Sequence, residues 1–574
     1  MPNFFEDNDD LLFHFKHLDL DKIIEFRENN FAEADKYGYA PSDIKDAKDS
    51  YERVLKITGQ IAGDIIEPNS AEVDEVGAKF KNGKVTYAPG TTIGLGAMKK
   101  ADLMGFTVPR KYGGLNCPMT LYCMAIEITS RADAAFMNIF GLQSDIADTI
   151  HKFADEEIKN KYLPILCEGN VTSSMALTEP DAGSDLQAVM LKAYQDGTGQ
   201  WFLNGVKRFI TNGSGEISLV LARSEEGSID GRGLSMFLYE RDDKMQIRRI
   251  ENKLGIHGSP TCEMQFNDAP AFLIGKRRVG LIKYVMSLMN EARIGIAAQS
   301  LGIAEAAYRE AKQYSEERKQ FKQPIKNFIA VSELLANMKV KIEAGRSLLY
   351  ESVIIVDMKD GIEEHVLKYP EEKKKYRSDL KKYTALANML TPMVKAYNSE
   401  MANEVANDGI QIHGGTGYMK EFNAERHFRD ARITNIYEGT TQLQIIAAIG
   451  GITKGVFMDL VNEYEEKIDS NSLEPFHSDI RKMVSYVEKS INFIKENNDK
   501  DFHSYHSRRL VEMSTKTIIA YLFLKAAKHS ERNKDVLKYF LEYALPEVKM
   551  NSEIILNKTS SFLENRSTIL ENKN

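Results

Sequence analysis

The spacing of apolar residues divides the chain into helical stretches on either side of a stretch that lacks helical spacing. Residues 1–48 are charged and only weakly periodic, which predicts an N-terminal extension with short helices. Residues 49–172 follow a helical pattern, and a loop is expected at 109–114, where the sequence reads Pro-Arg-Lys-Tyr-Gly-Gly. We therefore expect an N-terminal helical domain over 49–172.

The pattern changes at about residue 173 and stays changed to about 280. Two short apolar runs, 219–221 and 236–239, are bounded by glycine, serine and charged residues, as is typical of strands. Asn204 and Gly205 separate two further apolar runs, and this dipeptide predicts a type I′ hairpin. The stretch 173–280 is predicted to be a small β domain.

Helical spacing returns at about residue 281. Residues 297–311 carry one stripe of apolar and small side chains, which indicates a long helix that its neighbours approach closely. Residues 358–383 are dense in Lys and Glu around Pro370, which indicates a solvated helical excursion. Apolar stripes over 480–494 and 510–524 predict more helices. We therefore expect a helical-bundle domain over 281–452 and an extra helical domain over 453–574, in a chain that is mostly α with a central small β domain.

Composition narrows the class of protein only slightly. The chain has 574 residues, 43% of them hydrophobic, and a net charge of -8. A nucleic-acid partner is not expected, because binding a phosphate backbone requires a basic face. The four cysteines show no zinc spacing and favour buried free thiols in a reducing compartment. The acidic N-terminus and the absence of a long apolar run predict a cytoplasmic protein without an integral membrane segment.

Three segments carry candidate chemistry. Glu438 lies between an aromatic residue and a glycine, where it is either a catalytic base or an acid favoured by a helix N-terminus. Residues 175–185 read Met-Ala-Leu-Thr-Glu-Pro-Asp-Ala-Gly-Ser-Asp, a turn that can hold a ring edge and a phosphate or can simply be a capped loop. Gln411 precedes Gly414 and Gly415, and glycines allow a diphosphate close to the backbone.

Other motifs are absent from the sequence. No G-x-G-x-x-G follows a predicted strand, so a Rossmann dinucleotide site is not expected. The sequence has no H-E-x-x-H, no G-x-S-x-G and no P-loop. His413 and His427 are expected to have structural roles or to line a cofactor pocket, and no metal site is predicted.

Taken together and in their order, these segments resemble the acyl-CoA dehydrogenase family of FAD enzymes. The resemblance covers about the middle two-thirds of the chain, and Gln411 and Glu438 stand at the separation that the family shows. It implies an N-terminal helical domain, a β-barrel-like domain and a C-terminal four-helix bundle, followed here by a helical extension. Residues 253–262 look like the larger, C-terminally extended subgroup, which includes very-long-chain and 3-methylthiopropanoyl-CoA dehydrogenases.

The resemblance also implies roles for single residues. Glu438 matches the catalytic base, and at the alternative position of the base in some members this chain has Ala292, with Glu291 one place away. Phe209 stands where the family commonly has a tryptophan against the flavin. The positions that match substrate contacts are Ser184, Asn290, Arg293, Tyr437 and Gly439. The positions that match FAD contacts are Met175, Leu177, Thr178, Ser184, Phe209, Ile210, Thr211, Arg318, Gln320, Phe321, Phe328, Gln411, Gly414, Gly415, Thr440 and Gln442.

The activity that the resemblance implies is α,β-dehydrogenation of an acyl-CoA thioester to the trans-2-enoyl-CoA, as in fatty acid β-oxidation and lipid metabolism. Glu438 would take the α-proton, the β-hydride would pass to flavin N5, and electron-transfer flavoprotein would receive the electrons. A homodimer is expected, because Arg318, Gln411 and Gly415 match residues that reach the partner's FAD. Two alternatives stay open: an acyl-CoA oxidase that uses oxygen, and a DNA-binding alkylation-response flavoprotein on the same fold, which would require a basic C-terminal face.

Overall fold

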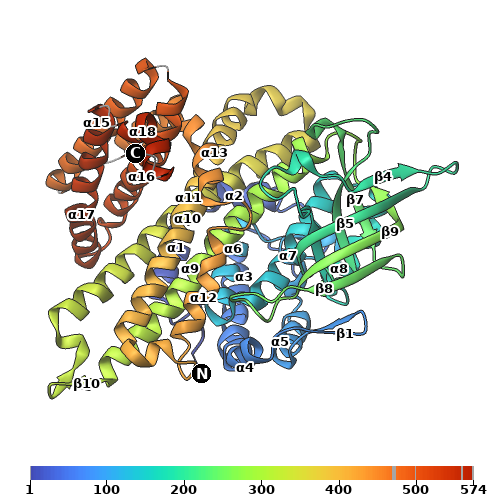
Figure 1. Cartoon of the computed structure of the whole chain (residues 1–574), viewed down its shortest axis with the longest axis horizontal. Helices are drawn as coiled ribbons and strands as arrows, with labels where there is room; N and C mark the ends of the chain where they lie inside the picture. The colour runs from blue at the N-terminus through green and yellow to red at the C-terminus, as the bar shows by residue number, and fades with distance from the viewer. Residues whose placement is uncertain (1, 468–472, 498, 558–559, 572–574) are drawn as a thin grey trace. The chain divides into compact units, whose positions relative to one another are not determined.

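The computed structural model describes residues 2–467, 473–497, 499–557 and 560–571. They form two compact units, which are described separately: unit 1 comprises residues 1–335 and 401–438, and unit 2 comprises residues 336–400 and 439–574. Helices predominate, and the larger strands all fall between residues 173 and 273 (Figure 1). The prediction of a mostly helical chain around a central β domain is confirmed.

Unit 1 begins with helices. Their bounds are α1 Asp9–His17, α2 Asp21–Arg27, α3 Ile44–Ile61, α4 Glu67–Val76, α5 Pro89–Lys100, α6 Met119–Ala132, α7 Ala134–Phe153 and α8 Glu156–Cys167. One feature of this region was not predicted: β1 Lys79–Lys81 and β2 Lys84–Thr86 form an antiparallel hairpin. Asn82 and Gly83 join these strands with φ of +52° and +75°, as a type I′ turn requires.

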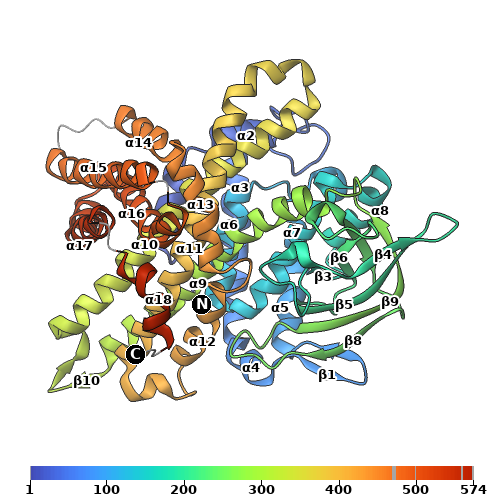
Figure 2. The same ribbon diagram turned by 45° about the horizontal axis from the view of Figure 1, so that its top comes forward.

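The β domain is one seven-stranded sheet that closes on itself, because β7 pairs with both β6 and β9. It lies at one end of unit 1, and its strands are seen from a second direction in Figure 2. Most neighbours are antiparallel, but β3 and β4 run parallel to β6. The strands are β3 Ser173–Ala176, β4 Lys192–Gln195, β5 Trp201–Thr211, β6 Ile217–Arg223, β7 Leu234–Glu240, β8 Met245–Ile250 and β9 Thr261–Leu273.

Two hydrophobic cores meet at β6, which is buried along its whole length. Leu219 and Leu221 pack with residues of α7 and α8, whereas Val220 and Ala222 pack inside the closed sheet with residues of β5 and β9. Successive side chains of a strand point to opposite faces, so a strand that lies between two cores has consecutive apolar residues where it crosses them. This explains the uninterrupted apolar run that predicted β6.

The predicted hairpin at Asn204 and Gly205 is wrong. Both residues lie inside β5, which pairs with β9 on either side of them. Gly205 has φ +138°, and the register with β9 shifts between Leu203 and Gly205, so the dipeptide forms a β-bulge. Asn204 Nδ2 donates to Asp268 Oδ1 of β9. The same tolerance for positive φ that suits Asn-Gly to a turn also suits it to a bulge.

After the sheet, unit 1 continues with α9 Met286–Glu317, the short strands β10 Lys319–Gln320 and β11 Gln323–Pro324, and α12 Ala424–Thr434. The predicted stripe of apolar and small residues lies on α9, where Ala297, Leu301, Ala304 and Ala311 are buried. The boundary between the units falls inside α10 Ile329–Lys368 and α11 Lys373–His413. The predicted helical excursion is the hairpin between these two helices, with Pro370 in its connection.

In unit 2 the C-terminal helices pack on one another and cover their own apolar stripes. Ile480, Met483, Val487, Ile491 and Ile494 of α15 are all buried. The helices are α13 Thr441–Thr453, α14 Val456–Lys467, α15 Glu474–Asn497, α16 Lys500–Ala526, α17 Glu531–Leu556 and α18 Ser561–Glu571. By length and apolarity, none of the described helices could cross a membrane alone, although α13 and α14 pass that test together with a bend of 65° between them.

One buried ion pair fastens the connection between β3 and β4 to β5. Lys207 of β5 is fully buried, and its Nζ donates to Leu177 O (2.7 Å) and to Glu179 Oε1 (2.8 Å). The Glu179 carboxylate also accepts the backbone N–H groups of Met190 (2.7 Å) and Leu191 (2.9 Å). Burial lowers the pKa of Lys207 to about 8, and the Glu179 charge opposes that shift.

We predict that Lys207→Met lowers the free energy of unfolding by about 3–5 kcal/mol, because Glu179 would remain buried without its cation. Urea unfolding followed by the fluorescence of Trp201, which lies in β5 and is the single tryptophan of the chain, measures it. Lys192→Met, which removes an exposed lysine of β4, is the control and is expected to change that energy by less than about 0.5 kcal/mol. Equal effects of the two variants would contradict the role of the ion pair.

Candidate active site

Glu438 lies on a tight turn in a strained backbone conformation. Its φ is +52°, and the next residue, Gly439, has φ +89°. A left-handed conformation is uncommon for a residue with a side chain and costs about 1 kcal/mol or more, and such strain gathers at functional sites. The sequence prediction of an acid on a tight turn agrees with this geometry.

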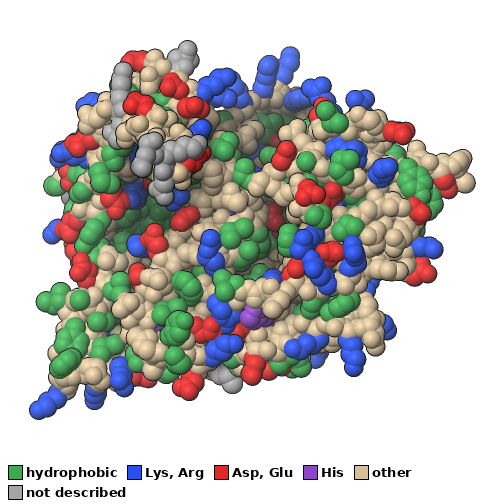
Figure 3. Space-filling view, in the orientation of Figure 1, with side chains coloured by type: hydrophobic (Ala, Val, Ile, Leu, Met, Phe, Trp, Pro, Cys, Tyr) green, Lys and Arg blue, Asp and Glu red, His purple; other side chains and the backbone are tan. Residues whose placement is uncertain are grey.

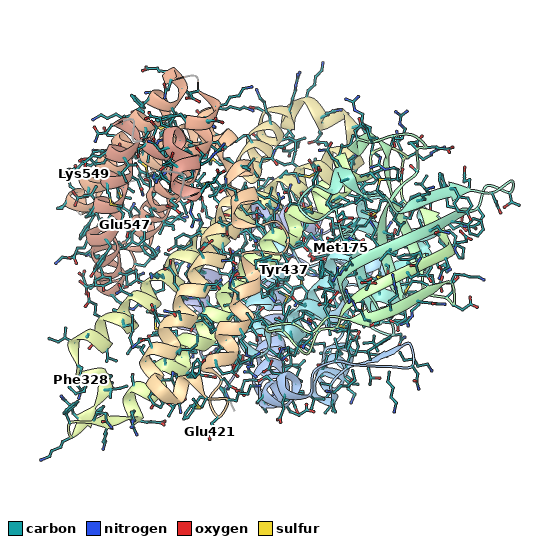
Figure 4. All side chains as sticks on the ribbon, in the orientation of Figure 1. Met175, Phe328, Glu421, Tyr437, Glu547 and Lys549 are labelled. Atoms are coloured by element: carbon teal, nitrogen blue, oxygen red, sulfur yellow. The ribbon has the colours of Figure 1, made fainter. Side chains whose placement is uncertain are left out.

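A buried chain of polar side chains anchors that turn. The hydroxyl of Tyr437 donates to Gln299 Oε1 of α9, and it lies 3.4 Å from Asn138 Oδ1 of α7. Gln299 is fully buried, and its amide donates to Asn138 Oδ1 and to Ala134 O, both at 3.0 Å. These contacts join residues 435–438 to α7 and α9, so the turn depends on both helices. Tyr437 is labelled in Figure 4.

Two charged groups influence Glu438. Arg293 of α9 is buried, and burial lowers the pKa of its guanidinium while the Glu438 charge opposes that shift. Its Nη1 donates to Asn290 Oδ1 (3.0 Å), and its Nε, among the described residues, makes no hydrogen bond. Asp145 of α7 is 9% exposed and accepts a hydrogen bond from Tyr122 (3.2 Å). Burial raises the pKa of Asp145 to about 7, and the Glu438 charge adds to that rise.

The predicted flavin segments 175–184 and 209–211 lie side by side, because the Arg208 amide donates to Thr178 O (2.9 Å). Phe209 has φ +61° and stands at a second bulge of β5, so its ring is 52% exposed, with the Arg208 guanidinium 4.6 Å from the ring centre. Ile210 and Leu177, in contrast, are buried in the two cores, so their side chains contribute packing. An exposed ring beside the half-exposed Thr178 and Thr211 suits a planar aromatic group with a polar edge.

The second predicted FAD set gathers at the end of α9. Arg318 follows the last residue of that helix, and Phe321, on the turn between β10 and β11, is 88% exposed with φ +48°. The ring of Phe321 meets that of Phe328 edge-on at 6.0 Å. Gln320 beside them is exposed. Figure 4 shows Phe328 at this end, away from Met175 and Tyr437.

The glycine segment lies close to the same end of α9. Tyr314 stacks on His413 at 4.4 Å and accepts a hydrogen bond from Thr416, so residues 413–416 lie about one turn before Arg318. A Cβ added to Gly414 or Gly415 would meet no atom within 4 Å, and both glycines are exposed, as is Gln411. Within the described residues, no hydrogen bond or ring contact joins this set to the Thr178–Phe209 region.

Thr440 and Gln442, the last two predicted FAD residues, belong to unit 2. Thr440 precedes α13, and Gln442 is exposed in its first turn. The carbonyl of Gly439 accepts hydrogen bonds from the buried Lys395 (2.7 Å) and from Gln444 (2.9 Å). Sequence reasoning missed Lys395, Lys207, Asp145, Asn138 and Gln299, because each lies on a regular element far along the chain from the residue that it serves.

No group of three or more histidine, cysteine or acidic side chains in the described part of the chain could hold a metal ion. The four cysteines are buried and free, as predicted. The donor set of the site is therefore aromatic, hydroxyl, amide and cationic, which suits an organic cofactor with a diphosphate.

Comparisons with known proteins point to one family. The chain matches family models described as acyl-CoA dehydrogenase N-terminal domain (residues 51–170), middle domain (174–269), C-terminal domain (282–450) and acyl-CoA dehydrogenase C terminal (453–561). An acyl-CoA dehydrogenase of Bacillus subtilis is 36% identical over 355 residues, which cover 60% of this chain and 86% of that protein.

Two further relatives extend over more of the chain. The 3-methylmercaptopropionyl-CoA dehydrogenase of Ruegeria pomeroyi is 31% identical over 437 residues, 72% of this chain and 71% of that protein. A crystal structure of an acyl-CoA dehydrogenase from Bacillus anthracis complexed with FAD has a TM-score of 0.76 and 25% identity, and the match covers 89% of this chain and 88% of that one.

The raised pKa of Asp145 predicts a pH-dependent stability. A carboxyl whose folded pKa is raised contributes stability below its unfolded pKa of 3.8, and that contribution is lost as pH rises through about 7. Asp145→Asn does not titrate, so the variant should be more stable than the parent at pH 8 and lose that advantage near pH 4. The stability difference between the variant and the parent should change by at most about 1.4 kcal/mol for each unit by which folding shifts the pKa of Asp145.

Thermal unfolding at the two pH values measures the difference. Glu157→Gln removes an exposed carboxylate of α8 and is the control, for which we expect the same difference from the parent at both pH values. A stability gap between Asp145→Asn and the parent that does not change with pH would contradict the prediction.

Proposed function

This chain belongs to the acyl-CoA dehydrogenase family and is an FAD-dependent oxidoreductase, and on that premise we propose how its residues carry out the reaction. The substrate is an acyl-CoA thioester, the product is the trans-2-enoyl-CoA, and Glu438 accepts the α-proton. When bound, FAD would supply the acceptor for the β-hydride. The observation that carries the proposal is Glu438 itself, held at φ +52° on a turn that Tyr437 anchors.

The surroundings of Glu438 suit a base that must gain and release a proton. The charge of Glu438 acts on two neighbours: it helps to raise the pKa of Asp145, and it favours the charged form of the Arg293 guanidinium. Tyr437 restrains the turn on one side of Glu438, and Lys395 and Gln444 hold the carbonyl of Gly439 on the other.

We propose that two sets of residues hold the cofactor. Thr178, Phe209 and Thr211 would hold the flavin ring together with the backbone of Met175, Leu177 and Ile210, and the exposed Ser184 would bind the diphosphate. The residues that would hold the remainder of FAD are Arg318, Gln320, Phe321, Phe328, Gln411, Gly414, Gly415, Thr440 and Gln442. The thioester would lie against Ser184, Asn290, Arg293, Tyr437 and Gly439.

We further propose electron-transfer flavoprotein as the electron acceptor and fatty acid β-oxidation in the cytoplasm as the setting. Free buried cysteines support a reducing compartment. No observation favours a DNA-binding role. Over most of the face in Figure 3, basic and acidic side chains are interspersed, whereas a nucleic-acid interface gathers basic ones.

We predict that Glu438→Gln retains FAD but loses flavin reduction by acyl-CoA, because an amide cannot accept the α-proton. Loss of a positioned base lowers the rate by about a hundredfold or more. Stopped-flow bleaching of the flavin absorbance measures the rate. Glu421→Gln, an exposed acid elsewhere in unit 1, is the control. If Glu438→Gln reduces as fast as the parent, the base is another residue, with Glu291 the next candidate.

We also propose a homodimer in which Arg318, Gln411 and Gly415 complete the partner's FAD site. Their exposure and the open space at Gly415 support this. Arg318→Ala should weaken FAD binding about tenfold to a hundredfold, the value of one charge-assisted contact. Flavin fluorescence measures the affinity and light scattering the mass, with Lys322→Ala as an exposed control. A monomer that retains full FAD affinity, or a tetramer, would contradict the assembly.

A further inference from the structure

On the face of α9 that contacts α7, one buried position is a glycine, Gly295. Glu291, Gly295 and Gln299 are four residues apart, so they share one face of the helix. The first and last of them contact α7, since Glu291 pairs with Lys152 (2.6 Å) and Gln299 bonds to Asn138 (3.0 Å). Gly295 is buried, yet a Cβ added to it would meet no atom within 4 Å. An open space therefore lies between the two helices at Gly295.

Asp145 stands opposite this space. Asn138, Asp145 and Lys152 are seven residues apart, so they lie on one face of α7, two turns from one to the next. Because Asn138 meets Gln299 and Lys152 meets Glu291, the helices run antiparallel along this contact. Asp145 is midway between the two contacts on α7, as Gly295 is on α9. The open space thus has a carboxyl group on its far wall.

The carboxyl group of Asp145 is only partly compensated inside the protein: the hydrogen bond from Tyr122 and the charge of Lys152 favour its charged form, and burial and the charges of Glu438 and Asp148 oppose it. It is nine-tenths buried, it accepts a hydrogen bond from Tyr122, and among the described residues it forms no ion pair. The nearby Lys152 is already engaged by Asp148 (2.8 Å) and Glu291. With Glu438 and Arg293 included, four carboxylates share this region with two cations. The region has room for a group that brings a donor or a positive charge.

We propose that the space between Asp145 and Gly295 receives the tail of the acyl chain, and that Asp145 binds a hydrogen-bond donor, hydroxyl or ammonium, carried by that tail. The inference rests on the proposed function, because Glu438, which interacts with Asp145, is taken as the base. The substrate class is therefore a short acyl-CoA with a polar end. A plain alkyl tail would strip water from the Asp145 carboxylate without replacing its hydrogen bonds, and a site built for a donor rejects the analogue that lacks it.

The test compares acyl-CoA thioesters of four to six carbons that end in methyl, hydroxyl or ammonium, on full-length enzyme with FAD. We expect kcat/KM to favour at least one donor-ended thioester over its methyl counterpart by tenfold or more. Asp145→Leu, of similar size and apolar, should reverse that preference. Asp148→Asn, which removes a carboxylate already paired with Lys152, should retain it. The hydroxyl and ammonium arms decide whether the donor is neutral or cationic.

Two further measurements keep the test independent of turnover and of one variant. Calorimetric binding of the same thioesters to Glu438→Gln should show the same order of affinities. Gly295→Ala places a methyl group in the open space without a clash and should raise KM most for the longest tails. The inference is overturned if methyl-ended thioesters are preferred at every length, or if Asp145→Leu retains a donor preference. In either case flavin reduction by methyl-ended thioesters would leave the proposed function standing.

Discussion

The buried ion pair between Lys207 and Glu179 is the contact on which the connection between β3 and β4 depends. One ammonium group inside the β domain holds the carbonyl of Leu177, and one carboxylate holds the amides of Met190 and Leu191. The connection between β3 and β4 is thereby fixed at both ends, although it has little regular structure of its own. Thr178 and Ser184 are carried by this connection, so their positions depend on the charge pair.

Buried charge is used in two ways in unit 1. Where the structure must be rigid, a cation and an anion are in contact and every oxygen has a donor, as in the pair of Lys207 and Glu179. Near Glu438, like charges approach one another, and Asp145 lacks a cation of its own. The second arrangement is costly for folding and is typical of places where protons or ligands are exchanged. The contrast separates the charges that fix the structure from those that surround the proposed base.

The elements and the turn of Glu438 were predictable, because apolar spacing and the residues around a turn are local signals. The apolar run 219–221 predicted a strand, which lies between two cores, and the glycine after Glu438 indicated a turn, where both residues have positive φ. Local signals also misled, since Asn204 and Gly205 form a bulge whose nature depends on Asp268, 64 residues away. The surroundings of Glu438, which include Asp145 and Gln299, could not be predicted, because only the packing of α7 on α9 brings them to its turn. The matching of single residues to FAD contacts stays a prediction.

The order in which the chain is synthesised has a consequence for how this protein matures. Unit 1 is discontinuous in sequence. Its last segment, residues 401–438, is synthesised after residues 336–400, which belong to unit 2. The contact between Tyr437 and Asn138 spans 299 residues, so the turn of Glu438 forms only after more than three-quarters of the chain has left the ribosome. The two units therefore cannot fold sequentially as independent N-terminal and C-terminal domains. No single cut in the chain separates all residues of one unit from all residues of the other. A nascent chain must hold its early helices in a soluble, incomplete state until the last segment arrives, which makes the interval before residue 438 the period of greatest need for chaperones.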